Sequence, residues 1–165
     1  MHKEDQSHLK VSKDKNMALV HKHIIIRAEV LNPPKAEYET CDKVKNLIDQ
    51  IGMKILMGPF AKYCEMQGNR GLTVATIIET SHIVMHSWDE KVPANIQLDV
   101  YTCGEFNPES VFSWLQQFNP TKIDYKYLDR EHGLTEIPID NPSSKTYTTK
   151  ELVEATKSIY PELWK

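Results

Sequence analysis

The sequence lacks both a membrane-spanning stretch and a strong charge of either sign. No apolar run approaches the roughly 18 residues that cross a bilayer, and residues 1–16 have no apolar segment typical of a signal peptide. The net charge of -3 creates no positive field that would gather nucleic acid. These absences predict a cytoplasmic protein with no nucleic-acid partner and no membrane partner.

The sequence also lacks the cysteine spacing of a disulfide framework or a zinc site. Its three cysteines, Cys41, Cys64 and Cys103, are odd in number and form no C-x-x-C pair. The histidines offer no metal site either: His82 and His86 are four residues apart, which is ~13 Å along a strand. We therefore expect no metal and a free thiol at Cys103.

The length and the distribution of apolar residues predict one domain. A chain of 165 residues with 40% hydrophobic content is long enough to bury a single core. Residues 1–17 are highly charged and poor in apolar side chains, which is typical of a mobile tail. We expect the folded domain to span residues 18–165.

Apolar periodicity predicts an α+β fold, a two-layer sandwich in which helices pack on one face of a mainly antiparallel sheet. Strands are expected at 19–30, 53–60, 72–78, 81–88, 94–104 and 121–128. Helices are expected at 37–51, where Gly52 ends the helix, at 107–118, where Asn107 and Pro108 begin it, and at 149–160. Residues 129–144 are expected to be irregular.

Residues 76–104 have the pattern of a β-hairpin, with Asp89–Ala94 as the turn region. In the first strand, His82 and His86 alternate with apolar residues and therefore share one face. In the antiparallel register, the start of the first strand lies beside the end of the second. The hairpin therefore predicts that Ser81 and Cys103 are neighbours.

A serine near a histidine and a thiol suggests nucleophilic or acid–base chemistry, but the residues alone leave alternatives open. The Gly-x-Ser-x-Gly elbow of serine hydrolases is absent around Ser81. Taken singly, Ser81 is equally a loop hydroxyl, His86 a hydrogen-bonded sheet histidine, and Cys103 a small buried apolar residue.

Two separated blocks narrow this choice. Residues 81–90 read SHIVMHSWDE, and residues 98–104 read LDVYTCG. In order and spacing, they resemble the S-H-x-x-x-H-S-W and D-V-Y-T-C-G motifs of the prokaryotic S-adenosylmethionine decarboxylase proenzymes. His23, near the start of the first strand, also matches the pattern of that family.

The resemblance implies a chain that cuts itself between Thr80 and Ser81. Ser81 then becomes a covalent pyruvoyl group, which forms a Schiff base with the substrate and serves as the electron sink for decarboxylation. His86 is implied in the proton transfers of self-cleavage, and on the chain it is the nearest candidate base. Thr73 matches a residue that assists processing, and Cys103 matches the proton donor to the substrate.

The resemblance also implies how the substrate is bound. Glu90 matches the acid that holds the ribose hydroxyls of S-adenosylmethionine, and Trp88 is placed to stack on adenine. Relatives pair as homodimers of cleaved protomers, and their product serves spermidine biosynthesis. The chain departs from the pattern at Thr80, where relatives usually have glutamate.

Two alternatives remain beside this interpretation. One is a pyruvoyl-dependent decarboxylase of another amino acid, arginine or ornithine, which would share the mechanism and differ in the pocket. The other is an unprocessed, non-catalytic family member that binds a ligand or a partner.

Overall fold

The computed structural model describes residues 20–139 and, near the C-terminus, Lys150, Val153, Glu154, Lys157 and Pro161. The tail predicted for residues 1–17 and most of the helix predicted for residues 149–160 lie outside the described residues. The fold is therefore that of residues 20–139.

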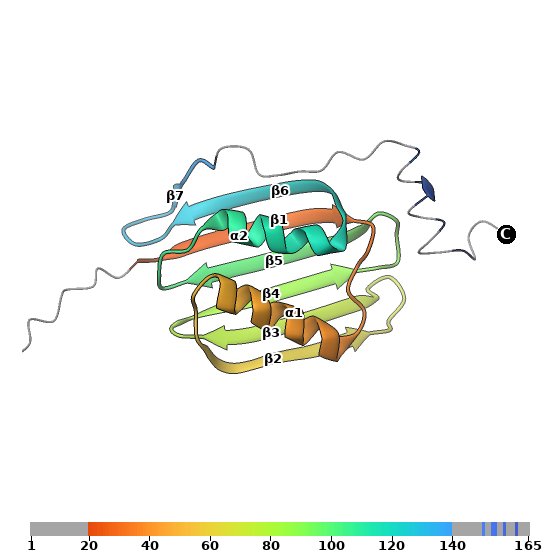
Figure 1. The fold of residues 1–165 in the computed structure, drawn as a ribbon, viewed down its shortest axis with the longest axis horizontal. Coiled ribbons are helices and arrows are strands. Elements are labelled where there is room, and N and C mark those ends of the chain that lie inside the picture. Colours follow the sequence, from red (N-terminus) through yellow and green to blue (C-terminus); the bar gives the residue numbers. More distant parts are fainter. Residues whose placement is uncertain (1–19, 140–149, 151–152, 155–156, 158–160, 162–165) are drawn as a thin grey trace, which may run out of the picture.

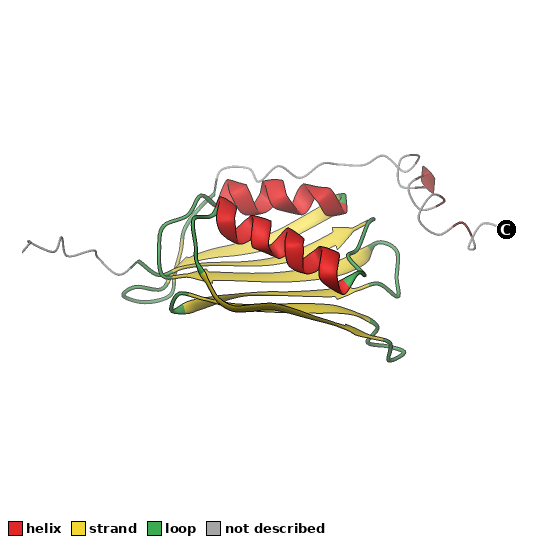
Figure 2. Cartoon of the chain, turned by 60° about the horizontal axis from the view of Figure 1, so that its bottom comes forward, coloured by secondary structure: helices red, strands yellow, loops and turns green. Residues whose placement is uncertain are grey.

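Seven strands form one sheet in the order β2-β3-β4-β5-β1-β6-β7, and every neighbouring pair is antiparallel (Figure 1). The strands are β1 (Lys22–Val30), β2 (Ile55–Cys64), β3 (Gly71–Ile78), β4 (Ser81–Trp88), β5 (Ala94–Thr102), β6 (Pro120–Asp129) and β7 (Thr135–Glu136). The helices are α1 (Glu37–Gln50) and α2 (Pro108–Leu115), which leads into a 3₁₀ turn at Gln116–Phe118. Both helices lie over the same face of the sheet, so the predicted two-layer α+β sandwich is confirmed (Figure 2).

Local chemistry sets the ends of both helices, as the sequence predicted. The side chain of Asn107 accepts a hydrogen bond of 3.0 Å from the backbone N–H of Glu109, and Pro108 occupies the first helical position. Gly52 follows α1 with a φ of 73°, a conformation that glycine adopts without steric cost.

Two strands differ from the prediction. β2 continues past residue 60 to Cys64, which is compatible with Pro59 because β2 is an edge strand that needs partners on one side alone. Within the stretch predicted to be irregular, Thr135–Glu136 forms β7 by pairing with β6. This pairing depends on the position of β6 and leaves no local signal in the sequence.

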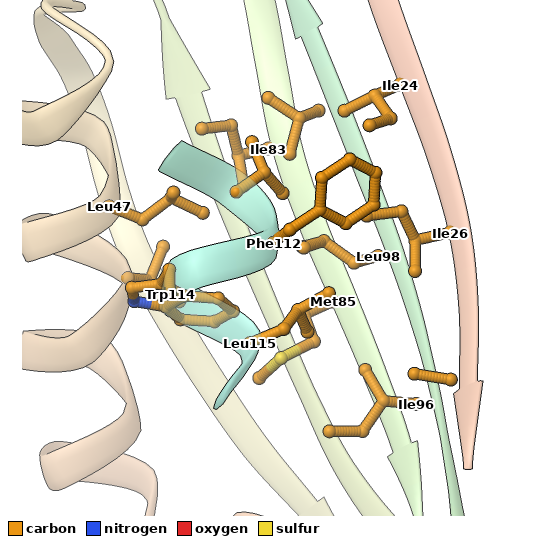
Figure 3. Packing of buried hydrophobic residues seen from close by; sticks show 14 of the residues in the cluster. Ile24, Ile26, Leu47, Ile83, Met85, Ile96, Leu98, Phe112, Trp114 and Leu115 are labelled. Carbon is orange, nitrogen blue, oxygen red and sulfur yellow. The ribbon is translucent and has the colours of Figure 1, made fainter. Parts of the chain in front are cut away.

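The core lies between the two helices and the sheet face that they cover (Figure 3). Every second residue of the central strands points into it, because successive strand side chains alternate between faces. Its buried members include Ile24 and Ile26 of β1, Ile83 and Met85 of β4, Ile96 and Leu98 of β5, Leu47 of α1, and Phe112, Trp114 and Leu115 of α2.

Within residues 20–139, no helix lies over the opposite face of the sheet (Figure 2). We call this surface the open face; the alternate strand residues form it, including Ile25 and Arg27 of β1, Phe60 of β2, Thr73 and Ile77 of β3, His82 and His86 of β4, and Asp99 of β5. Ile25, Phe60 and Ile77 are exposed large apolar residues. The open face therefore combines apolar surface with most of the residues that the motifs singled out.

We expect Phe112→Ala to lower the free energy of unfolding by about 3–5 kcal/mol. Phe112 is fully buried, and its ring lies 5.2 Å from that of Tyr125, so truncation leaves a cavity between α2 and the sheet. Urea denaturation measures the loss. Tyr38→Ala, at a largely exposed residue, is the control and should stay within about 0.5 kcal/mol of the wild type. Equal stability of the two variants would contradict this core assignment.

Candidate active site

A two-residue turn joins β3 to β4 and contains the peptide bond predicted to be cut. Ile78 pairs with Ser81, so Glu79 and Thr80 form the turn. Thr80 has a φ of 52°, which is unfavourable for a β-branched residue and stores roughly 1–3 kcal/mol of strain. The Thr80–Ser81 bond therefore directly follows a strained residue.

Ser81 and Cys103 meet at one backbone oxygen. The Ser81 hydroxyl donates to the carbonyl of Glu79 at 3.0 Å, and the Cys103 thiol donates to the same carbonyl at 2.9 Å. The proximity predicted from the hairpin is confirmed. The hydroxyl and the thiol thus both contact the backbone of the strained turn.

Beside them on the open face, Asp99 bridges two histidines from neighbouring strands. One oxygen, Oδ1, lies 2.7 Å from Nε2 of His23 and 3.1 Å from Nε2 of His82. Burial alone raises the pKa of Asp99, but the hydrogen bonds and charges of His23 and His82 outweigh it, so that the pKa lies below its ordinary value. Asp99 is therefore a stable carboxylate next to the Ser81 turn.

Arg130 and Tyr101 complete this cluster. Arg130 donates from Nη1 to Nδ1 of His23 at 3.0 Å, and its guanidinium carbon lies 4.3 Å from the centre of the Tyr101 ring. Because Nδ1 of His23 accepts this bond, its Nε2 carries the proton that bonds Asp99. The cluster thus fixes the tautomer of His23.

His86 lies at the other end of β4. Its Nδ1 is 2.9 Å from the Thr73 hydroxyl, and the two residues pair across β3 and β4. His86 is five residues from Ser81 on one straight strand, about 16 Å at the usual rise per residue. Within one chain, His86 does not reach Ser81, contrary to the expectation that it is the nearest base.

Trp88 and Glu90 lie at the same end as His86. The Trp88 indole donates to the side-chain oxygen of Asn69 at 2.9 Å, and Glu90 accepts from the backbone N–H of Gly68 at 2.8 Å. Both side chains line a cavity of about 510 Å³, together with Arg27, Glu29, Gly68, Lys91, Val92, Pro93 and Asn95. This cavity is of a size that fits a small ligand.

A groove of about 660 Å³ joins the two ends of the open face. His82, His86 and Asp99 line it, so it passes both the Asp99 cluster and the His86 end. No group of three histidine, cysteine or carboxylate side chains in residues 20–139 is arranged to hold a metal ion, and none of the helices assigned there is long and apolar enough to cross a bilayer. The site is thus built from an acid, histidines, a hydroxyl and a thiol.

The family model described as S-adenosylmethionine decarboxylase matches residues 24–131, which is more than half of the chain. The chain belongs to the S-adenosylmethionine decarboxylase family. All of the motif residues, from Thr73 to Cys103, fall within the matched range. The resemblance seen in the sequence is therefore confirmed at the level of the family.

Known relatives agree with this assignment. S-adenosylmethionine decarboxylase proenzymes from Pyrobaculum arsenaticum and Pyrobaculum islandicum are 41% and 39% identical over 64 residues, which are 38% of this chain and 50% of theirs. The match thus spans about half the length of these curated relatives. The adenosylmethionine decarboxylase of Aquifex aeolicus superposes with a TM-score of 0.52 at 22% identity, covering 74% of this chain and 98% of that one, and shows that the fold is shared.

In this family member, the residues predicted from the sequence separate into two groups. Ser81 and Cys103 lie at one end of the sheet, and Thr73, His86, Trp88 and Glu90 lie at the other. The two ends are also the two ends of the β4 arrow in Figure 1. One chain therefore carries two half-sites rather than one assembled site.

The sequence did not predict the contact between Asp99 and His23 near Ser81. The family resemblance singles out His23, but nothing in the sequence predicts that its strand is a neighbour of the strand that carries Asp99. β1 pairs with β5, which places His23 opposite Tyr101 and next to Asp99. A sequence separation of 76 residues hides this contact.

We expect Asp99→Asn to weaken the dependence of stability on acid. Because its folded-state pKa is lowered, the Asp99 carboxylate contributes stability above its unfolded pKa of about 3.9, and this contribution is lost as the pH falls through the folded value. The wild type should lose stability below about pH 4, and Asp99→Asn should lose less. Urea unfolding at a series of pH values measures both.

Asp49→Asn, at an exposed position of α1, is the control for the removal of one charge. Identical acid profiles for the wild type and Asp99→Asn would contradict the lowered pKa.

Proposed function

We propose that this chain is a self-cleaving, pyruvoyl-dependent decarboxylase that converts S-adenosylmethionine to S-adenosylmethioninamine for spermidine biosynthesis. One observation carries the proposal: the Ser81 hydroxyl and the Cys103 thiol converge on the carbonyl of Glu79, beside the strained Thr80. The membership of the family supports it. We place the reaction in the cytoplasm, because a reducing compartment keeps the three free cysteines reduced.

Self-cleavage begins with attack of the Ser81 oxygen on the carbonyl carbon of Thr80. The backbone C–N bond breaks and an ester forms, so that the strain at Thr80 is released in the product. Elimination at Ser81 then frees the carboxyl group of Thr80, and water releases ammonia from the new N-terminus. These residues fit the formation of a pyruvoyl group, because the Ser81 hydroxyl already contacts the turn that precedes the bond to be cut.

The pyruvoyl group supplies an electron-withdrawing carbonyl for the loss of CO2 from the amine-linked substrate. The chain itself must then return a proton to the α-carbon of the substrate. Cys103 is the donor, because its thiol lies at the same backbone oxygen as the Ser81 hydroxyl. The neighbouring Asp99 contacts His23 and orients His82 along the wall of the groove.

We further propose that two chains pair through their open faces as a homodimer. A two-fold axis makes the contact self-complementary, so that the Ser81 end of one protomer faces the His86 end of the other. Each complete site then combines Ser81 and Cys103 of one protomer with Thr73 and His86 of its partner. The exposed apolar residues of the open face supply the driving force for this pairing.

In this arrangement, the cavity beside Trp88 and Glu90 binds the nucleoside part of the substrate. Glu90 accepts hydrogen bonds from the ribose hydroxyls, and Trp88 offers an aromatic face to adenine. S-adenosylmethionine therefore suits this cavity better than arginine or ornithine, which carry no ribose.

We expect wild-type protein to release CO2 from S-adenosylmethionine and to consist of two fragments, residues 1–80 and 81–165. Ser81→Ala has no hydroxyl to attack Thr80 and should remain at 19.1 kDa without activity. Intact mass and labelled-CO2 release measure the two properties, with arginine and ornithine as competing substrates. A wild type that stays uncleaved would instead favour a non-catalytic family member.

We expect Ser81→Ala and His86→Ala to complement each other when they are co-expressed. A mixed dimer combines one intact Ser81 with one intact His86 in a single site, so random mixing should restore about a quarter of wild-type cleavage. Each variant expressed alone should remain largely uncleaved. Fragment intensity on a denaturing gel measures the recovery, and Ser81→Ala co-expressed with a Ser81→Ala, His86→Ala double variant is the control. The absence of recovery would contradict the shared site.

A further inference from the structure

The turn between β4 and β5 contains a fully buried carboxylate that the reaction does not use. The side chain of Asp89 is 0% exposed. Its oxygens accept hydrogen bonds from the Tyr63 hydroxyl at 2.7 Å and from Nε of Arg70 at 3.0 Å, and Nζ of Lys35 lies 3.5 Å away. One carboxylate thus binds side chains from β2, from the β2–β3 loop and from the segment before α1.

The charge of Asp89 is stable because these partners are in place. Burial alone raises the pKa of Asp89, but the hydrogen bonds from Tyr63 and Arg70 outweigh it and hold the pKa below its ordinary value. In return, burial and the hydrogen bond to Asp89 raise the pKa of Tyr63 to about 12. A buried charge that loses a partner is costly, so the cluster resists any movement of Arg70.

Three neighbouring contacts connect the loop at 68–70 to the segment at 88–90. Arg70 binds Asp89 through its side chain, and the backbone N–H of Asp89 donates to the carbonyl of Arg70 at 3.3 Å. Beside this central contact, Asn69 accepts from Trp88, and Gly68 donates to Glu90. Asp89 is the buried member of the three, and the outer two contacts are exposed.

We propose that Asp89 and Arg70 are positioning residues that hold the Glu90 carboxylate ready for the ribose diol of the substrate. This proposal rests on the proposed function. The bond from Gly68 engages one oxygen of Glu90 and leaves the other to accept a hydroxyl. Because Gly68 is two residues from Arg70, fixing Arg70 on the buried Asp89 fixes the N–H that orients Glu90.

The geometry also explains why the effect is confined to binding. The Asp89 cluster lies at the Trp88 end of β4, seven residues from Ser81 at its other end. In one chain, it contacts neither Ser81 nor Cys103. In the proposed homodimer this end faces Ser81 of the partner subunit, but Asp89 is bound by Tyr63, Arg70 and Lys35 and by no reacting group. Loosening the cluster should therefore disturb the hold on the nucleoside and leave the chemistry of the pyruvoyl group in place.

The test is Arg70→Ala, alone and combined with Glu90→Gln. Arg70 is 45% exposed, so its truncation removes the partner without opening the core. Arg70→Ala should raise the KM for S-adenosylmethionine about tenfold and change kcat by less than about twofold. In the Glu90→Gln background, it should cause no further rise, because both changes remove the same interaction.

Lys45→Ala is the matched control. Lys45 is a similarly exposed cation, at 47%, and it pairs with an aspartate on α1, far from the cavity in the fold. It should leave KM unchanged. Arg70→Lys, which retains the positive charge, should recover part of the lost affinity.

Calorimetric binding of 5′-methylthioadenosine, which carries the ribose diol but no reactive amine, separates this proposal from the proposed function. If wild-type protein binds the nucleoside and Arg70→Ala weakens binding about tenfold, the positioning role stands even where no CO2 is released. Equal binding of the wild type and Arg70→Ala, or additive effects of Arg70→Ala and Glu90→Gln, would overturn it. If the wild type releases CO2 from S-adenosylmethionine but does not bind the nucleoside, the positioning role is overturned and the proposed function stands.

Discussion

The burial of one sheet face under α1 and α2 is the constraint on which the rest of the structure depends. Because strand side chains alternate between faces, the demand for apolar residues on the covered side leaves every second position free on the other. Ile83 and Met85 belong to the core, while His82 and His86, which flank them in sequence, lie on the open face. A shift of one residue in β4 would bury the histidines, so the core maintains the register of the site.

The same antiparallel register brings some of the predicted site residues together and keeps others apart. It brings the start of β4 beside the end of β5, which joins Ser81 to Cys103, and it carries His86 to the far end. A rigid strand cannot bend to close this separation. The division follows from the hairpin itself, and the proposed homodimer would resolve it with a second copy of the open face and without any movement within the protomer.

Local signals in the sequence account for the parts of the fold that it predicts correctly. The hairpin follows from alternation and turn residues, and the limits of the helices follow from Asn107 and Gly52, each acting on its own neighbours. The strain at Thr80 leaves no such signal, because a two-residue turn without glycine gives no hint of a positive φ. The order of the strands is equally hidden, and so the contact of His23 with Asp99 could not be predicted.

Asp99 and Asp89 show why long-range contacts matter at this site. Asp99 and Asp89 are both held as carboxylates by partners from other elements, the first by His23 and His82 and the second by Tyr63 and Arg70. Such clusters fix the positions of their neighbours. Asp99 sets the tautomer and direction of the histidines beside Ser81. Asp89 sets the position of the loop that orients Glu90. Each half-site thus has one carboxylate that touches no reacting atom and fixes the groups that do.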